Sequence, residues 1–164
     1  MQIDLGNLSP LRMMLPSELV LATKLTRKVA RLRERWRSTN SGKDLGPGKE
    51  RALSIDISVA EGELESLVDG VLARQLGLKR YMVVHVQRDG GHEDRFQLLS
   101  ASVHFGFTYQ GHRWMWDLEG RRLRKDGSIG ERPGGMAIDA GVITRRMLDG
   151  SWVELHPTYA EEVA

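Results

Sequence analysis

His104 and Asp117 are the two side chains whose types and predicted placement come closest to a catalytic arrangement. The turn signal Gln110-Gly111 predicts a hairpin with a two-residue loop, and in that register His104 lies directly across from Asp117. A carboxylate beside an imidazole stabilises the imidazolium and fixes its tautomer, which is the support that a general base needs. Because no serine or threonine nucleophile can be assigned, the sequence favours a charge-assisted surface pair over a catalytic one.

Other catalytic and metal-binding signatures fit poorly. The chain has no cysteine, and its five histidines form none of the spacings HxH, HxxxH or HExxH. A metal site made of His85, His104 and Asp117 would need their strands to be neighbours. Residues 119–121, Glu-Gly-Arg, carry arginine where an acidic nuclease motif would use lysine, and arginine accepts no proton. We therefore expect no cofactor and no metal, and we rank a hydrolase or nuclease using His104 and Asp117 last.

Lysine and arginine side chains gather in two parts of the chain. Residues 15–37 hold seven basic residues and two acidic ones, and a second basic run follows the aromatic segment that starts at Phe105. If both groups contact phosphates, the chain is a small nucleic-acid-associated binding or regulatory protein, which is the function that we expect. The candidate phosphate-contacting residues are Lys24, Arg27, Lys28, Arg31 and Arg35 in the first group, and Arg113, Arg121, Arg122, Arg124 and Lys125 in the second.

The competing function is a protein–protein interaction or assembly module. A basic helix over residues 15–37 could dock on an acidic protein surface, or join copies of the chain as a homo-oligomer. Small, basic, cysteine-free α+β proteins of this kind are common on phages and plasmids, which fits either function. The helix also carries an apolar stripe at spacings of 3, 4, 3 and 4, formed by Ala22, Leu25, Val29, Leu32 and Trp36.

Composition agrees with a cytoplasmic protein that buries a hydrophobic core. The chain has 164 residues, of which 40% are hydrophobic, and its formal net charge is only +2. A surplus this small indicates a nucleic-acid partner only through its distribution along the chain. No apolar run approaches the length of a membrane span, and the first residues lack the features of a signal peptide.

Helix and strand patterns divide the chain into three predicted parts. A helix begins near Pro16 and belongs to an N-terminal basic helical arm, residues 1–40. A linker rich in Gly, Ser, Asn and Pro covers 41–52, and an α+β domain covers 53–164. Within that domain, residues 53–59 alternate between apolar and polar side chains, which predicts a strand.

The rest of the domain predicts one helix followed by strands. The helix follows the predicted strand and ends at Gly77. From Tyr81 onward the pattern indicates strands, separated by turn signals at Gln110-Gly111, Glu119-Gly120, Asp126-Gly127 and Asp149-Gly150. The predicted fold class is therefore α+β: a mainly antiparallel twisted sheet of about five or six strands with a packed helix, plus the N-terminal basic amphipathic helix.

The aromatic residues near the predicted hairpin admit two interpretations. With Gln110-Gly111 as the loop, rings from both strands gather on one face, with Phe105 opposite Trp116. A continuous apolar face is what a sheet packs on a helix, so a core position is the favoured interpretation. The alternative is a base-stacking platform of the kind used by proteins that bind single-stranded nucleic acids.

Overall fold

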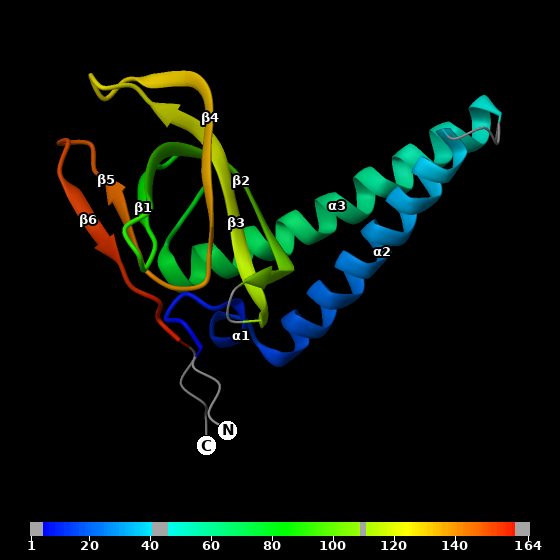
Figure 1. Ribbon diagram of the computed structural model, residues 1–164, viewed down its shortest axis with the longest axis horizontal. Coiled ribbons are helices and arrows are strands. Elements are labelled where there is room, and N and C mark those ends of the chain that lie inside the picture. Colours follow the sequence, from blue (N-terminus) through cyan, green and yellow to red (C-terminus); the bar gives the residue numbers. More distant parts are fainter. Residues whose placement is uncertain (1–4, 41–45, 109–110, 160–164) are drawn as a thin grey trace. The chain divides into compact units, whose positions relative to one another are not determined.

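The chain folds as an α+β protein, and its antiparallel sheet has six strands among the described residues (Figure 1). The computed structural model describes residues 5–40, 46–108 and 111–159. The predicted fold class is confirmed, with a helix packed on the sheet and a basic N-terminal helix preceding it. Within the described ranges, no helix is both long enough and apolar enough to cross a membrane.

The chain forms two compact units, which we call the helical unit and the sheet unit. The helical unit, Pro16–Leu67, contains α2 (Pro16–Asn40) and the first part of α3 (Pro47–Leu76). The sheet unit joins Met1–Leu15 to Val68–Ala164 and contains the end of α3 with all the strands. The predicted division into an arm, a linker and a domain stays a prediction.

Helix α2 begins at Pro16, as predicted, and buries the predicted apolar stripe. Ala22, Leu25 and Val29 are 0%, 5% and 9% exposed, and the last two members of the stripe are half-buried. In Figure 1 α2 runs beside α3, and an ion pair of 2.6 Å joins Arg33 of α2 to Glu61 of α3. The helix therefore has one packed side, which leaves the opposite side to solvent.

The predicted strand at residues 53–59 is wrong, because this segment lies inside α3. Leu53 and Ala60 are seven residues apart, lie on one helical face, and are both buried. Ile55 and Val59 are 54% and 51% exposed on another face. The alternating apolar side chains therefore belong to two faces of one helix, one buried and one exposed. The helix forms despite the strand propensity of Ile and Val because its buried face packs in the core.

The predicted linker is helical over residues 47–52, where α3 begins. Pro47 takes the first helical position, at which its missing N–H leaves no hydrogen bond unmade. Residues 41–45 of the predicted linker lie outside the described residues. The predicted end of the helix is confirmed, since α3 ends at Leu76 and Gly77 follows with φ of 63°.

The sheet is antiparallel throughout, with strand order β4-β3-β2-β1-β5-β6. The first four strands follow one another as a meander, and β5 then crosses to pair with β1 on the other side. In Figure 1 the C-terminal part of α3 lies against the sheet. The strands are β1 (Val83–Gln87), β2 (Glu93–Thr108), β3 (Gly111–Leu123), β4 (Ile129–Ile138), β5 (Val142–Arg146) and β6 (Trp152–Leu155).

A β-bulge in β2 keeps the apolar side chains of this long strand on one face. The register shifts between Leu98 and Ser100, so two β2 residues oppose one β3 residue there. Without the extra residue, the side chains after the bulge would point to the opposite face. With it, Phe96 and Leu98 before the bulge and Ala101 and Val103 after it are all buried.

Gly120 sits opposite the bulge, inside β3, so the predicted turn at Glu119-Gly120 is wrong. A Cβ at Gly120 would lie 1.8 Å from the carbonyl oxygen of Gln97 and 2.9 Å from the Phe96 ring. The glycine is thus required by the close approach of the bulged strand rather than by a turn.

We expect Gly120→Ala to lower the free energy of unfolding by about 1–3 kcal/mol, because the bulged backbone must move aside. Gly70→Ala is the matched control, since a Cβ on this α3 glycine meets nothing within 4 Å. That substitution should raise the free energy of unfolding by about 0.5–1 kcal/mol through helix propensity. Urea titrations of both variants measure the two changes in the free energy of unfolding. Changes of the same sign would contradict the conclusion that Gly120 is required by the close approach of the bulged strand.

The β2–β3 hairpin is shifted by two residues from its predicted register. Thr108 pairs with Gly111, so Gly111 belongs to β3 and the predicted loop Gln110-Gly111 is wrong. Gly111 has the expected positive φ, 99°, but uses it at the first residue of β3. Tyr109 and Gln110, and the side chain of Phe107, lie outside the described residues. Because the shift is even, each side chain keeps its predicted face and changes only its partner.

The N-terminal segment is tied into the sheet unit by hydrogen bonds. Leu8 is buried, and its carbonyl oxygen accepts a hydrogen bond of 2.6 Å from the indole Nε1 of Trp116. Its amide donates to the carbonyl of Asp139, and the side chain of Asn7 bonds both the amide and the carbonyl of Gly141. These bonds secure the crossing segment between β4 and β5, so the first residues are part of the sheet unit.

Candidate nucleic-acid interface

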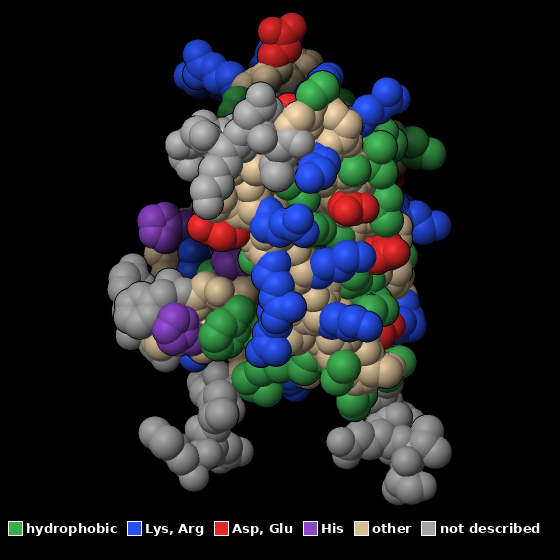
Figure 2. Space-filling model, turned by 90° about the vertical axis from the view of Figure 1, so that its right-hand side faces the viewer, with side chains coloured by type: hydrophobic (Ala, Val, Ile, Leu, Met, Phe, Trp, Pro, Cys, Tyr) green, Lys and Arg blue, Asp and Glu red, His purple; other side chains and the backbone are tan. Residues whose placement is uncertain are grey.

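The five predicted cations of α2 form one exposed row, which we call the basic strip: Lys24, Arg27, Lys28, Arg31 and Arg35. Figure 2 looks onto the side on which α2 lies in Figure 1 and shows a row of lysine and arginine side chains down it. At about 100° per residue, the strip is centred about 130° around the helix from the apolar stripe. The helical period that buries the stripe is thus what exposes the cations.

Two acidic side chains of the helical unit form ion pairs with arginines outside the basic strip. Glu61 pairs with Arg33, and Glu34 lies 3.9 Å from Arg37. Both arginines lie on the side of α2 opposite the basic strip. In the part of the chain that the structure describes, no acidic side chain forms an ion pair with any member of the strip. The strip is therefore available to an external anion.

A shallow hollow of about 460 Å³ runs along the first half of the strip. Leu19, Val20 and Thr23 line it together with cations of the strip. Val20 is 70% exposed, so this part of the surface is both apolar and positively charged. Such a surface suits a partner that combines an anionic group with an apolar one.

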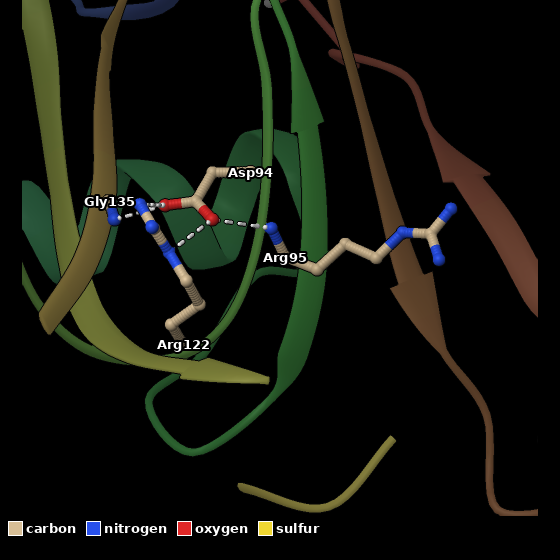
Figure 3. Close-up of polar contacts among 4 residues, drawn as sticks. All are labelled: Asp94, Arg95, Arg122 and Gly135. Atoms are coloured by element: carbon tan, nitrogen blue, oxygen red, sulfur yellow. Dashed lines mark hydrogen bonds and ion pairs between the residues drawn. The ribbon is translucent and has the colours of Figure 1, made fainter. Parts of the chain in front are cut away.

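The second predicted group lies in the β3–β4 hairpin of the sheet unit. Arg121, Arg122 and Arg124 are exposed, as is Lys125 in the turn. Arg122 is held by the carboxylate of Asp94, to which its Nε donates at 3.0 Å and its second guanidinium nitrogen at 3.1 Å (Figure 3). For the other three cations, no ion pair occurs among the described residues.

The side chain of Asp94, which holds Arg122, is 9% exposed. It also accepts hydrogen bonds from the amides of Arg95 (2.9 Å) and Gly135 (2.8 Å), which Figure 3 shows converging on its two oxygens. Sequence patterns gave no signal for Asp94, because its segment reads as a solvated turn and Arg122 lies 28 residues away. An ion pair between residues this far apart in the sequence can be predicted only once the register of the strands is known.

The β3–β4 turn is closed by Asp126. This carboxylate accepts hydrogen bonds from the hydroxyl of Ser128 at 2.7 Å and from its amide at 2.9 Å. Both bonds lower the pKa of Asp126 below its ordinary value of 3.8, and the bond from the hydroxyl has the larger effect. Because the folded pKa is the lower one, the carboxylate supports the turn above pH 3.8, and the support is lost as the pH falls through the folded pKa. Ser151 lowers the pKa of Asp149 in the same way.

Arg113 differs from the other predicted phosphate contacts. Its guanidinium lies 3.0 Å from a carboxylate oxygen of Asp139, and both side chains are largely buried, at 25% and 13% exposed. A guanidinium engaged in this way contributes to the structure of the sheet unit. Arg113 therefore carries no part of the interface that we propose below.

His104 and Asp117 are not opposite each other, contrary to the prediction. In the shifted register His104 faces Met115, and Asp117 faces Ser102. No hydrogen bond or ion pair between His104 and Asp117 occurs in the structure, and both side chains are partly exposed. No group of three or more potential ligands among the described residues is placed to hold a metal ion. The pairing on which the hydrolase alternative rested is therefore absent.

The aromatic residues divide between the core and the surface. Trp116 is buried beside Val103, whereas Phe105, two residues further along β2, is 53% exposed. Phe105 stacks on His112 with ring centroids 5.4 Å apart. The centroid of the Trp114 ring lies 5.5 Å from that of Phe105. These rings lie where β2 pairs with β3 alone, so cross-strand stacking stabilises the ribbon.

Comparison of this chain with family models, with curated proteins and with solved structures finds no match.

Proposed function

We propose that this protein binds nucleic acid, with the basic strip of α2 as its principal phosphate-contacting surface and the β3–β4 hairpin as a second one. The observation that carries the proposal is the row of five exposed cations with no acidic partner among the described residues. Like charges in a row repel one another, and an anion that neutralises them in place relieves this repulsion. The phosphates of a nucleic acid supply such anions in a regular series.

The length of the strip fits a short stretch of nucleic acid. From Lys24 to Arg35 the helix rises by about 17 Å, over which one DNA strand presents about five phosphates at about 3.4 Å each. Lysine and arginine contacts to phosphates fix position and orientation but read no bases. We therefore propose sequence-independent binding, in a cytoplasmic protein that has direct access to nucleic acid.

Two matched double variants of α2 test this proposal. Lys28→Gln with Arg31→Gln removes two charges from the basic strip, and Arg33→Gln with Arg37→Gln removes two from the opposite side. Each phosphate contact adds about 0.9 to the decimal logarithm of the binding constant at about 0.1 M salt. The first variant should therefore bind a DNA duplex between about tenfold and sixtyfold more weakly. Fluorescence anisotropy of a labelled duplex of about 20 base pairs measures this change.

The control variant separates local contact from net charge. Both variants lower the net charge by the same amount, so a purely long-range effect would weaken binding equally in the two. We expect the Arg33→Gln, Arg37→Gln variant to retain affinity within about threefold. Equal losses in the two variants, or no binding by the unmodified protein at about 50 mM salt, would refute the proposal.

An assembly module is the second candidate function, and the exposure of Val20 favours it. A valine that is 70% exposed between cations suits an acidic protein surface with an apolar patch, or another copy of the chain docking along residues 15–37. The two functions differ in what they predict for mass. A molecular mass that rises with protein concentration and is restored to that of the monomer by Val20→Ser would favour assembly.

A further inference from the structure

A second hollow, of about 610 Å³, lies on the β3–β4 hairpin. Its volume is within the range of about 300–1,000 Å³ that is usual for small-molecule sites. Four cations line it, together with the single carboxylate of Glu131: Arg122, Arg124, Lys125 and Arg132. Among the described residues, neither Arg124, Lys125 nor Arg132 forms an ion pair. With Arg122 paired to Asp94, the other three cations give the hollow a surplus of positive charge, which Glu131 and Asp126, an electrostatic neighbour of Arg124, offset only in part.

The backbone around this hollow is held in place from three directions. Asp94 fixes Arg122 through two charge-assisted hydrogen bonds. Asp126 closes the turn through Ser128, and Arg146 of β5 donates a hydrogen bond of 2.9 Å to the carbonyl of Gly127. The cations thus extend from a fixed frame, which lowers the entropic cost of gathering them around a ligand.

Gly130 keeps the hollow open. A Cβ at this position would lie 2.8 Å from the carbonyl oxygen of Arg122 and 3.4 Å from Cγ of Arg124. A side chain there would displace the strand next to the hollow or fill part of the space between the cations. The close approach of β4 to β3 at a glycine is thus part of what shapes the site.

We infer that this hollow is a binding site for a phosphate-bearing anion with at least two negative charges. Guanidinium groups recognise phosphate oxygens through paired hydrogen bonds, and several cations around one cavity favour a multiply charged anion. The ligand is either a phosphate of a nucleic acid or a free di- or polyphosphate, since both present the same chemistry. This site belongs to the sheet unit and does not depend on the basic strip of α2.

Titration of the full-length protein with inorganic pyrophosphate tests the inference. We expect amide resonances of Gly130 and Ser128 to shift, and Arg124→Gln with Arg132→Gln to weaken binding by about tenfold or more. The Arg33→Gln, Arg37→Gln variant of α2, which also loses two positive charges, should bind pyrophosphate as the unmodified protein does. Absence of pyrophosphate binding, or equal weakening in the two variants, would overturn the inference.

Competition with an oligonucleotide distinguishes the two sources of phosphate. If pyrophosphate displaces a bound oligonucleotide from the hairpin, as read from the same resonances, the site takes nucleic-acid phosphates. If both bind together, it takes a free phosphate compound. Pyrophosphate binding without any oligonucleotide binding would leave this site standing while refuting the proposed function, so the two failures are distinguishable.

Discussion

Trp116→Ala is expected to lower the free energy of unfolding by about 3–5 kcal/mol, the largest stability effect that the structure predicts for a single substitution. The indole is 1% exposed, so its removal leaves a cavity in the core of the sheet unit. The substitution also removes the 2.6 Å hydrogen bond to the carbonyl of Leu8, which is itself buried. The buried carbonyl left without its donor places the expected loss at the upper end of this range unless the N-terminal segment moves.

Trp152→Ala is the control for this prediction. Trp152 is 39% exposed and contacts the His85 ring edge-on, so its removal should cost about 1 kcal/mol or less. Urea unfolding followed by circular dichroism compares the two variants without relying on tryptophan fluorescence. Equal losses in Trp116→Ala and Trp152→Ala would show that Trp116 is not a central core residue.

Sequence periodicity predicted the amphipathic helix and the sheet, because each rests on a pattern that is local in the chain. The stripe from Ala22 to Val29 repeats at the helical period and is buried as expected. The strand prediction for residues 53–59 was wrong because a helix shows the same alternation of apolar side chains when two of them, here Ile55 and Val59, are exposed. Burial, which the chain alone does not show, decides between the two.

The hairpin register illustrates a second limit. A glycine after a polar residue predicts a turn, but several loops can place that glycine at a positive φ. In this chain Gly111 begins β3 instead of closing the loop, and the two-residue shift separates His104 from Asp117. When the register shifts by an even number of residues, each side chain stays on the same face of the sheet but has a different partner across the strands. The face of a side chain is therefore predicted more reliably than its partner.

Most of the candidate interface could be predicted because lysine and arginine on an amphipathic helix stay at the surface. What could not be predicted is which cations are already paired. Arg113 meets Asp139 and Arg122 meets Asp94 through contacts between distant segments of the sheet unit. The surroundings of a charge, more than its presence, decide whether it is available to a ligand.

Neutralising the whole basic strip is expected to have the largest effect on binding. A variant with glutamine at all five positions should lose nearly all affinity for nucleic acid at about 0.15 M salt, because about five phosphate contacts are removed together. Its fold should persist, since the five side chains are exposed and glutamine has a helix propensity close to that of lysine and arginine. Circular dichroism checks that α2 remains helical.

The dependence of affinity on salt tests the central claim most directly. We expect the logarithm of the binding constant of the unmodified protein to fall linearly with the logarithm of salt concentration from about 50 to 200 mM. For the five-glutamine variant the slope should be smaller in magnitude by about 3.5 if the ligand is single-stranded and about 4.5 if it is a duplex. Equal slopes for the two proteins would contradict the claim that the basic strip of α2 contacts phosphates.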